Sequence, residues 1–317
     1  MYKESVKMKV LIFSHISDID GMGGVILAKL AYQNVDYVLT ETFDLQHKID
    51  EYMASGKIYD YDLVYVTDVW LEEPTLSKVA NNSKLKDKFL LFDHHESAID
   101  EGFDKYPFTT IRIKDELGLC SGTSLFYEYL IKENILKESK GISRFVELTR
   151  RYDTWEWKNI YNDEMAHELT LLFYVLGCDG YINLIYNKIK ENNLEFEFNE
   201  IENTLINNKK KQILEKVSNY KDKIFVKEIN GLKAGIVFID YEYRNDLVEY
   251  LRNFDLSIDI IMMVAMDKGT ISYRSISGVA VRSIAESFGG KGHDYAAASP
   301  ISKEVQEKII NILTTKD

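Results

Sequence analysis

Cysteine and proline are scarce in this 317-residue sequence, which contains two cysteines and three prolines. Cys120 and Cys178 do not form a ligand-spaced pair, and so few cysteines fit a reducing compartment, where we expect both to be small core residues. With three prolines and 17 glycines, the chain is unlike a disordered or linker-dominated protein. Its 45% hydrophobic and 28% charged residues instead predict a globular protein with a sizeable core.

Positive charge is also in short supply. The formal net charge is −12 and the isoelectric point is about 5.1. Proteins that bind long duplex nucleic acid carry a basic face, so this balance argues against extended nucleic-acid contact. It still permits a local basic pocket that holds one or two phosphates. A site built from several metal-binding aspartates would add to the negative total.

Long hydrophobic runs are missing from the N-terminal segment, "MYKESVKMKVLIFSH". Its short apolar run is interrupted by Ser14 and His15. It is too short and too polar for a signal peptide or a membrane span. We therefore expect a cytoplasmic protein without a membrane partner.

Three short apolar runs mark the first hundred residues: Val10–His15, Leu63–Asp68 and Phe89–His95. Each run is continuous rather than alternating, which is typical of strands covered on both faces. Helical patterns such as Gly23–Asn34 lie between them. Strands that alternate with helices predict an α/β fold with a parallel sheet.

The composition changes between about residue 187 and residue 223, where Asn, Lys and Glu predominate and apolar residues recur at helical spacing. We interpret this segment as exposed helix between domains, with Lys209–Lys211 on its solvated face. Later segments, including "GLKAGIVFID" and "FGGKGHDYAAAS", predict a second, smaller mixed α/β domain. The predicted boundaries are residues 1–185, a helical linker at 186–225, and residues 226–317.

Each of the three apolar runs ends in residues that bind metals: His15, Asp68, and the triplet Asp93-His94-His95. The carboxyl ends of parallel strands form the crevice where ligands bind, so we expect these side chains to converge. Taken alone, the adjacent histidines are equally well explained as polar loop residues. The repetition at three strand ends favours a site.

Two further segments add carboxylates. In "SHISDIDGMGG", Asp18 and Asp20 follow the first strand, although Asp20 or Gly21 could instead cap the helix expected to begin near Gly23. In "RYDTWEW", Asp153 stands among aromatic residues, where a buried carboxylate needs a partner. A cation would satisfy Asp153, and so would a helix cap or a salt bridge to a neighbouring arginine.

Carboxylates with a few imidazoles and no thiolates suit manganese, with magnesium or iron as substitutes, better than structural zinc. Seven candidates exceed the needs of one ion, and two ions bridged by a shared carboxylate are a usual arrangement for phosphoryl hydrolysis. The pattern therefore predicts a two-metal hydrolase. Its candidate residues are His15, Asp18, Asp20, Asp68, His94, His95 and Asp153.

The ordered motifs "HISDIDG", "VTDVW", "FDHHES" and "YDTW" resemble those of the DHH phosphoesterase family. "SYRS" followed by "FGGKGHDYAAAS" resembles the family's associated substrate-binding domain. Together the motifs span residues 15 to 299, nearly the whole chain. The resemblance implies an N-terminal parallel-sheet DHH catalytic domain, a C-terminal DHH-associated domain and an enzyme that uses two Mn²⁺ ions.

The resemblance also implies roles for individual residues. Asp68 would bridge the two ions, and His95 would contact the phosphate or act as an acid toward the leaving oxygen. Asp93 would orient a histidine. The first metal position would take His15, Asp18 and Asp68, and the second Asp20, Asp68, His94 and Asp153. Substrate phosphate would be bound by Arg274, Gly289, Gly290, Gly292 and His293.

Two departures from the family pattern limit this transfer. The spacing after His15 varies among family branches, so the first motif does not assign Asp18 and Asp20 to particular ions. Lys291 stands where many members have another glycine, either as an added phosphate contact or as a solvated side chain.

The form "YDTWEW" resembles the oligoribonuclease-like, nanoRNase branch, which implies hydrolysis of very short RNAs or dinucleotides to mononucleotides. A short substrate agrees with the acidic charge. Cyclic dinucleotides and 3′-phosphoadenosine 5′-phosphate are alternatives. Pyrophosphate is disfavoured because the expected basic cluster is missing. A nucleotide-binding protein without catalysis would lack at least one metal position, and none is missing. The resemblance also allows a homodimer.

Overall fold

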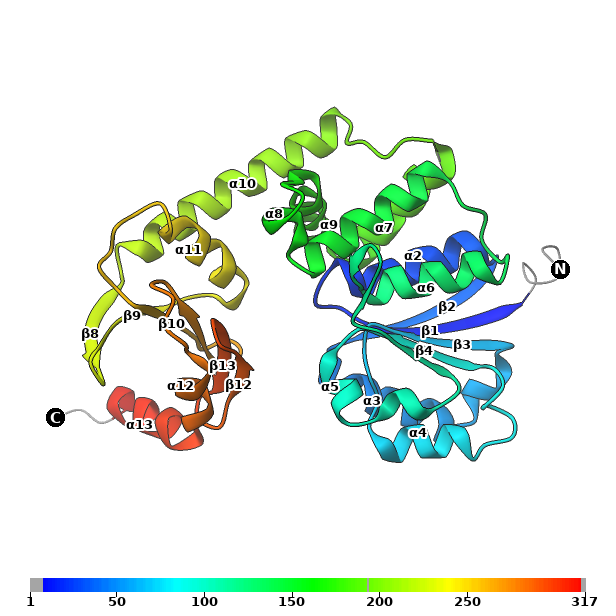
Figure 1. Cartoon of the computed structure of the whole chain (residues 1–317), viewed down its shortest axis with the longest axis horizontal. Coiled ribbons are helices and arrows are strands. Elements are labelled where there is room, and N and C mark those ends of the chain that lie inside the picture. The colour runs from blue at the N-terminus through cyan, green and yellow to red at the C-terminus, as the bar shows by residue number, and fades with distance from the viewer. Residues whose placement is uncertain (1–7, 193, 315–317) are drawn as a thin grey trace. The chain divides into compact units, whose positions relative to one another are not determined.

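The structure is a computed structural model that describes residues 8–192 and 194–314. The chain divides into two compact units, Met1–Ile206 and Asn207–Asp317. The division falls inside helix α10, Glu200–Lys221 (Figure 1). That position lies within the segment 186–225 that the sequence predicts as a linker, and the boundaries of the linker itself stay a prediction.

Unit 1 contains a five-stranded parallel sheet in the order β2-β1-β3-β4-β5. Its strands are β1 Lys9–His15, β2 Asn34–Thr40, β3 Leu63–Thr67, β4 Phe89–Asp93 and β5 Thr109–Ile111. A short antiparallel hairpin, β6 Lys114–Asp115 and β7 Gly118–Leu119, follows. The predicted parallel α/β sheet is confirmed.

The apolar runs are continuous because helices cover both faces of the sheet (Figure 1). Val10 and Ile12 pack into one core cluster, whereas Leu11 and Phe13 pack into the other. The helices of unit 1 are α2 Ile19–Ala31, α3 Thr42–Ala54, α4 Glu73–Ala80, α5 Glu96–Asp100, α6 Gly122–Lys132, α7 Lys140–Asp153, α8 Glu156–Asn159 and α9 Glu164–Glu191. Short 3₁₀ turns span Lys57–Asp60 and Phe103–Lys105.

The first helix begins earlier than the sequence pattern predicts. We expected it near Gly23, with Asp20 or Gly21 as its cap, but α2 starts at Ile19 and Asp18 is the N-cap. The glycines at positions 21, 23 and 24 concealed this start, because glycine is a poor helix former in isolation. They are needed for close packing: a Cβ on Gly23 would lie 2.0 Å from Thr123 Oγ1.

The strand order places a topological switch at β1. The chain passes from β1 to β2 on one side and then to β3 on the other side of β1. In open parallel sheets this reversal leaves a crevice at the carboxyl ends of the two strands that diverge. The crevice therefore lies where β1 ends at His15 and where Asp68 follows β3.

Unit 2 contains a six-stranded mixed sheet in the order β12-β13-β11-β10-β9-β8. Strands β9 and β10 pair in parallel, and the other neighbours pair antiparallel. The predicted second, mixed α/β domain is confirmed. Its elements are β8 Phe225–Ile229, β9 Leu232–Phe238, the 3₁₀ turn Tyr241–Tyr243, α11 Arg244–Leu251, β10 Ile260–Ala265, β11 Thr270–Ser275, α12 Arg282–Ser287, β12 Lys291–His293, β13 Ala296–Pro300 and α13 Lys303–Thr314.

Helix α9 is long and apolar enough to cross a membrane by length and composition alone. Gly177 interrupts it with non-helical angles, φ 67° and ψ 179°, so each helical half is shorter than the roughly 20 residues that a span needs. Its buried side chains, including Leu169 and Tyr181, pack into the core of unit 1. These features are those of a core helix.

Candidate metal centre and substrate-binding residues

Asp68 occupies a strained position directly after β3. Its φ is 62°, in the left-handed region that residues other than glycine seldom adopt. Its N–H donates to the carbonyl of Phe92 at 2.8 Å, and its side chain is buried. Gly122 packs against it so closely that an added Cβ would lie 2.5 Å from Asp68 Cβ. The fold thus turns this carboxylate into the crevice at a cost of about 1–3 kcal/mol.

The two oxygens of Asp68 face two different histidines. Oδ2 lies 2.6 Å from His15 Nε2, and Oδ1 lies 3.1 Å from His94 Nε2. His15 ends β1, whereas His94 directly follows β4. Three strand ends that are distant in sequence therefore meet at one carboxylate, as the topology requires.

Asp20 is held by the N-terminus of α6. Its Oδ2 accepts a hydrogen bond from the Gly122 N–H at 2.7 Å, and its Oδ1 accepts one from the Thr123 N–H at 3.0 Å. The Thr123 hydroxyl also donates to the Asp20 carbonyl at 3.0 Å. A helix N-terminus stabilises an anion, which makes α6 a fixed support for this buried carboxylate.

Asp18 has two tasks. Its Oδ1 accepts hydrogen bonds from the N–H groups of Asp20 and Gly21, which caps α2. The same oxygen lies 3.8 Å from His15 Nε2. The capping alternative considered for this loop thus falls on Asp18, and capping keeps the carboxylate beside the histidine.

Asp153 ends α7 and points toward the same cluster. Its Oδ2 lies 3.3 Å from His94 Nε2 and accepts no hydrogen bond from the described residues, although the atom is buried. In the part of the chain that the structure describes, Arg150 and Arg151 pair with carboxylates other than Asp153. The salt bridge to a neighbouring arginine is therefore not observed among the described residues, and a buried oxygen that faces His94 without accepting a hydrogen bond from them is suited to a cation.

Asp93 and His95 form a separate pair at the end of β4. His95 Nδ1 lies 2.8 Å from Asp93 Oδ1, with the His95 side chain 49% exposed and the Asp93 side chain fully buried. A carboxylate on one ring nitrogen fixes the orientation of the imidazole and leaves the other nitrogen available. The exposed ring lies next to His94, with centroids 4.5 Å apart.

The buried charges perturb one another strongly. Burial, with repulsion by Asp68, raises the pKa of Asp20 to about 7. Burial also raises the pKa values of Asp18 and Asp153. Burial alone would raise the pKa of Asp68 and lower those of the histidines, but their ion pairs outweigh it. The pKa of Asp68 is held well below its usual range, and those of His15 and His94 rise to about 10 and about 11.

The donor set fits divalent cations. Within each of three groups the ligand atoms lie within 4.8 Å of one another: His15-Asp18-Asp68, Asp20-His94-Asp153 and Asp68-His94-His95. The first two groups hold the side chains expected at the two metal positions, and Asp68 contacts a histidine of each. Mostly carboxylate donors, close enough to repel each other without a cation, suit Mn²⁺ or Mg²⁺ rather than a thiolate-selective metal.

Arg274 in unit 2 is half-buried on β11. Its guanidinium donates to the Tyr273 carbonyl at 3.0 Å and to Asn245 Oδ1 at 3.2 Å. Among the described residues no carboxylate forms an ion pair with it. Burial and the nearby guanidinium of Arg244 lower the pKa of Arg274 to about 10. This positive environment is suited to an anion. Local sequence does not reveal it, because Arg244 lies thirty residues before Arg274.

The predicted glycine loop packs against β13. Gly289 has φ +74° and Gly292 has φ +148°, and a Cβ on Gly290 would lie 2.1 Å from the Ala298 carbonyl oxygen. The N–H groups of Gly289 and Gly290 donate to carbonyls of Glu286 and Ala285. The phosphate contact expected of these glycines stays a prediction. The side chain of His293 lies outside the described residues.

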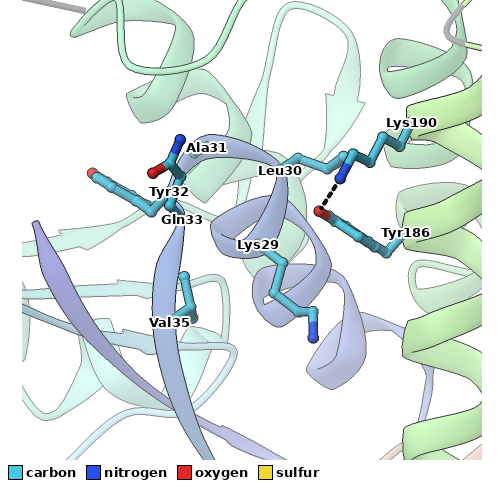
Figure 2. Close-up of a pocket in the computed structure, with 8 residues that line it drawn as sticks. All are labelled: Lys29, Leu30, Ala31, Tyr32, Gln33, Val35, Tyr186 and Lys190. Atoms are coloured by element: carbon cyan, nitrogen blue, oxygen red, sulfur yellow. Dashed lines mark hydrogen bonds between the residues drawn. The ribbon is translucent and has the colours of Figure 1, made fainter. Parts of the chain in front are cut away.

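A cavity lies at the opposite, amino edge of the sheet in unit 1 (Figure 2). It is lined by the end of α2, the following loop and two residues of α9. Lys29 Nζ and Lys190 Nζ lie 5.6 Å and 5.2 Å from the ring centroid of Tyr186, and Lys190 donates to its hydroxyl at 3.1 Å. The lining contains no histidine or carboxylate, so it offers nothing to a metal.

Oligoribonuclease NrnB of Bacillus subtilis (strain 168) is 28% identical to this chain over 302 residues, which cover 94% of this chain and 74% of that protein. The solved structure of the pGpG-specific phosphodiesterase PggH from Vibrio cholerae has the same fold, with a TM-score of 0.51 at 15% identity. That match covers 96% of this chain and 97% of the other.

This confirms the resemblance to the DHH phosphoesterases. An uncharacterized protein from Helicobacter pylori G27 is also similar, with a TM-score of 0.49 at 17% identity over 97% of this chain and all of that one. No family model matches the chain. In the triplet Asp93-His94-His95 that carries this resemblance, His94 faces the carboxylate cluster and His95 faces Asp93.

Proposed function

We propose that this DHH-type protein is a metal-dependent phosphodiesterase that hydrolyses very short oligonucleotides, including linear dinucleotides, to mononucleotides. The proposal includes two Mn²⁺ ions, for which Mg²⁺ or Fe²⁺ could substitute, and a cytoplasmic enzyme without a membrane partner. The observation that carries it is Asp68, whose two oxygens are divided between His15 and His94. A carboxylate in that position is suited to bridge two cations.

The residues would divide between two metal positions. His15, Asp18 and Asp68 would hold one ion, and Asp20, Asp68, His94 and Asp153 the other. Two bound divalent cations lower the pKa of a water molecule and neutralise charge that develops on a phosphate. The chain's own contribution is a rigid arrangement, because α6 holds Asp20, the cap of α2 holds Asp18 and the packing of Gly122 holds Asp68.

His95 would act on the substrate rather than hold an ion. Its Nδ1 faces Asp93, so the other ring nitrogen can contact a phosphate oxygen or donate a proton to the leaving oxygen. Asp93 raises the pKa of His95 against the effect of burial, which favours the protonated ring that such a donor needs. Asp93 would then be the positioning partner of a catalytic histidine.

Arg274 and His293, with Gly289, Gly290 and Gly292, would bind a substrate phosphate in unit 2. For Arg274 the support is a half-buried guanidinium that lies near a second arginine, Arg244, and forms no ion pair with a carboxylate of the described residues. Short substrates also agree with the net charge of −12, because one or two phosphates need a pocket rather than a long basic surface. The names of the B. subtilis and V. cholerae proteins, an oligoribonuclease and a pGpG phosphodiesterase, support the same substrate class.

A substrate panel tests the proposal. The full chain is incubated with Mn²⁺ and with di- to pentanucleotides, cyclic dinucleotides, 3′-phosphoadenosine 5′-phosphate and pyrophosphate, and the products are resolved by chromatography. We expect mononucleotides from the linear di- to pentanucleotides, no reaction in excess chelator, and no reaction with His94→Ala.

Other outcomes would replace the proposal. Rapid release of phosphate from pyrophosphate with inert dinucleotides would identify a pyrophosphatase. Preferential cleavage of cyclic dinucleotides or of 3′-phosphoadenosine 5′-phosphate would change the substrate. Tight dinucleotide binding without turnover in saturating Mn²⁺ would indicate a binding protein.

A further inference from the structure

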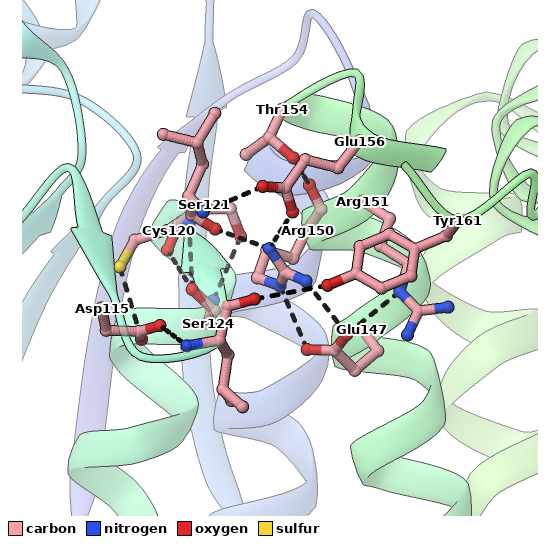
Figure 3. A network of polar contacts seen from close by, with 12 residues as sticks. Asp115, Cys120, Ser121, Ser124, Glu147, Arg150, Arg151, Thr154, Glu156 and Tyr161 are labelled. Carbon is pink, nitrogen blue, oxygen red and sulfur yellow. Dashed lines mark hydrogen bonds and ion pairs between the residues drawn. The ribbon is translucent and has the colours of Figure 1, made fainter. Parts of the chain in front are cut away.

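Two buried charged residues flank Asp153 in the sequence, one three positions before it and one three positions after it. Arg150 is 3% exposed and Glu156 is 6% exposed. Arg150 Nη1 donates to Glu156 Oε2 at 2.5 Å (Figure 3). Removing two charges from water is costly, and a buried pair often contributes little net stability, which leaves its structural task to be explained.

The pair holds both backbone polar groups of one residue in the β6–β7 hairpin. Arg150 Nη1 donates to the Leu119 carbonyl at 2.7 Å, and the Leu119 N–H donates to Glu156 Oε1 at 3.1 Å. The neighbouring Gly118 admits this contact, because an added Cβ there would lie 2.7 Å from Glu156 Oε1. These contacts join Arg150 of α7 and Glu156 of α8 to the hairpin.

Leu119 leads directly into the support of Asp20. Ser121, two residues later, caps α6, and the next two N–H groups, of Gly122 and Thr123, donate to the Asp20 carboxylate. The ion pair therefore links the chain segment that carries Asp153 to the segment that fixes Asp20. These two carboxylates, with His94, form one of the three groups of converging ligand atoms.

We propose that Arg150 and Glu156 form a clamp that sets the separation of Asp20 and Asp153 and thereby controls the affinity of one of two metal positions. Both are positioning residues, since neither belongs to a group of converging ligand atoms. The other position has His15 and Asp18, which lie on neither of the two segments that the clamp joins, and it shares Asp68, which packs against Gly122, with the clamped position. The inference rests on the two-ion site of the proposed function. It adds that the affinity of one metal position depends on the clamp more than the affinity of the other does.

The test replaces the clamp with apolar side chains in the full-length protein. In Arg150→Met/Glu156→Leu both charges are removed together, so neither is left buried without a partner, and Glu147, which also pairs with Arg150, keeps its contact with Arg151. Mn²⁺ binding is followed by electron paramagnetic resonance of the free ion during titration, without any substrate. We expect one of two Mn²⁺ affinities to fall by about 10- to 100-fold, the range seen when residues supporting metal ligands are changed, while the other changes by less than about threefold.

A matched control is available in unit 1. Lys188 Nζ lies 2.8 Å from Glu202 Oε2, a carboxylate 3% exposed, and this pair joins α9 to α10. Lys188→Met/Glu202→Leu removes a comparable ion pair and should leave both Mn²⁺ affinities unchanged. Arg150→Lys keeps the charge but loses the planar guanidinium, and should give a smaller loss in the same affinity. Circular dichroism of each metal-free variant establishes that it is folded.

The inference is overturned if both affinities are unchanged in the folded clamp variant, or if both fall together as they would after general loosening. Arg150→Lys supplies the same comparison if the double variant does not fold. Failure of the proposed function gives a different result: wild-type protein would bind two Mn²⁺ ions and leave every dinucleotide intact. Normal turnover with unchanged Mn²⁺ affinities in the clamp variants would contradict the proposed clamp and leave the proposed function standing.

Discussion

The carboxyl and amino edges of the sheet in unit 1 carry charges of opposite sign in different environments. At the carboxyl edge, Asp20 and Asp68 are buried, and the surrounding side chains repel or pair with one another. At the amino edge, Lys29 and Lys190 surround the Tyr186 ring at a cavity open to solvent. One edge concentrates charge where it is costly, and the other leaves charge where water can solvate it.

This difference shows why a cavity alone does not identify a site. At the amino-edge cavity, Lys190 donates to the Tyr186 hydroxyl, and the ammonium groups of Lys29 and Lys190 lie beside the Tyr186 ring. The carboxyl edge has a strained backbone at Asp68 and, on Asp153, a buried oxygen that accepts no hydrogen bond from the described residues. Such unfavourable features are retained where function requires them. We therefore expect large effects from changes at the carboxyl edge and small effects at the amino edge.

The largest effect is expected for Asp68→Asn, which keeps the shape of the side chain and removes its charge. Loss of a shared ligand should cost several kcal/mol of transition-state stabilisation, or a rate decrease of at least about a thousandfold. Initial rates on a dinucleotide in saturating Mn²⁺ measure this effect. More than a tenth of the wild-type rate would show that Asp68 is not the bridge.

The next effect is the stabilisation of the protein by Mn²⁺ and its dependence on pH. At 100 times the dissociation constant, one bound ion should raise the free energy of unfolding by about 2.7 kcal/mol. The increase in melting temperature on adding Mn²⁺, recorded between pH 6 and pH 8.5, measures it. We expect this increase to grow with pH, because protons compete for the same groups.

The sign of this pH dependence follows from the metal-free charges. The pKa values of His15 and His94 are raised to about 10 and about 11, so their contribution to stability is complete below pH 6.5 and declines above it. The pKa of Asp20 is raised to about 7, so its contribution declines from about pH 4 to pH 7. The low pKa of Asp68 acts only below this range. An increase in melting temperature that shrinks with rising pH would contradict the assignment.

A smaller effect is expected for Gly122→Ala. The added methyl group would lie 2.5 Å from Asp68 Cβ, and overpacking of this kind costs about 1–3 kcal/mol. Denaturant unfolding of the metal-free protein measures the loss. Gly102→Asn is a suitable control, because Gly102 has positive φ with nothing within 4 Å of an added Cβ. Equal stability of Gly122→Ala and wild-type protein would show that the backbone yields at this contact.

The smallest effect is expected for Lys29→Ala/Lys190→Ala at the amino edge. The two substitutions remove both ammonium groups of the cavity without touching the carboxylate cluster. We expect kcat/KM for a dinucleotide to change by less than about twofold, which is near 0.4 kcal/mol. A tenfold loss would show that part of the substrate binds at this edge. It would contradict the expectation that changes at the amino edge have small effects.

Much of the carboxyl edge could be predicted from the sequence because parallel strands bring their ends together. His15, Asp68 and His94 were recognisable as residues at strand ends, and the structure brings them within hydrogen-bonding distance. The predicted start of α2 was wrong, because a glycine-rich first turn conceals a helix whose stability comes from packing. Local sequence carries helix and strand propensity and hydrophobic periodicity. Neither predicts a helix boundary that is determined by tertiary contacts.

The supports of the site could not be predicted for the same reason. Asp20 is bound by N–H groups 102 and 103 residues later in the chain. Arg150 was considered as a partner of Asp153, yet it pairs with Glu156 and Leu119 instead. Backbone N–H groups have no residue signature, and several carboxylates near an arginine are equally plausible partners from sequence alone. The roles of the ligands and of Arg274 stay predictions, and Asp68→Asn and His94→Ala test those of two ligands.

The left-handed backbone at Asp68 restricts which mutations this position can accept. Asparagine, aspartate and glycine adopt such angles most readily, whereas a β-branched or longer side chain adds strain. Selection for folding alone should therefore recover Asn and Gly at position 68, and selection for metal-dependent turnover should recover Asp. Glutamate keeps the charge, but it is strained at this backbone angle and its longer side chain places the carboxylate elsewhere. Under the proposed function, aspartate at position 68 would meet both the requirement on backbone conformation and the requirement for a short carboxylate.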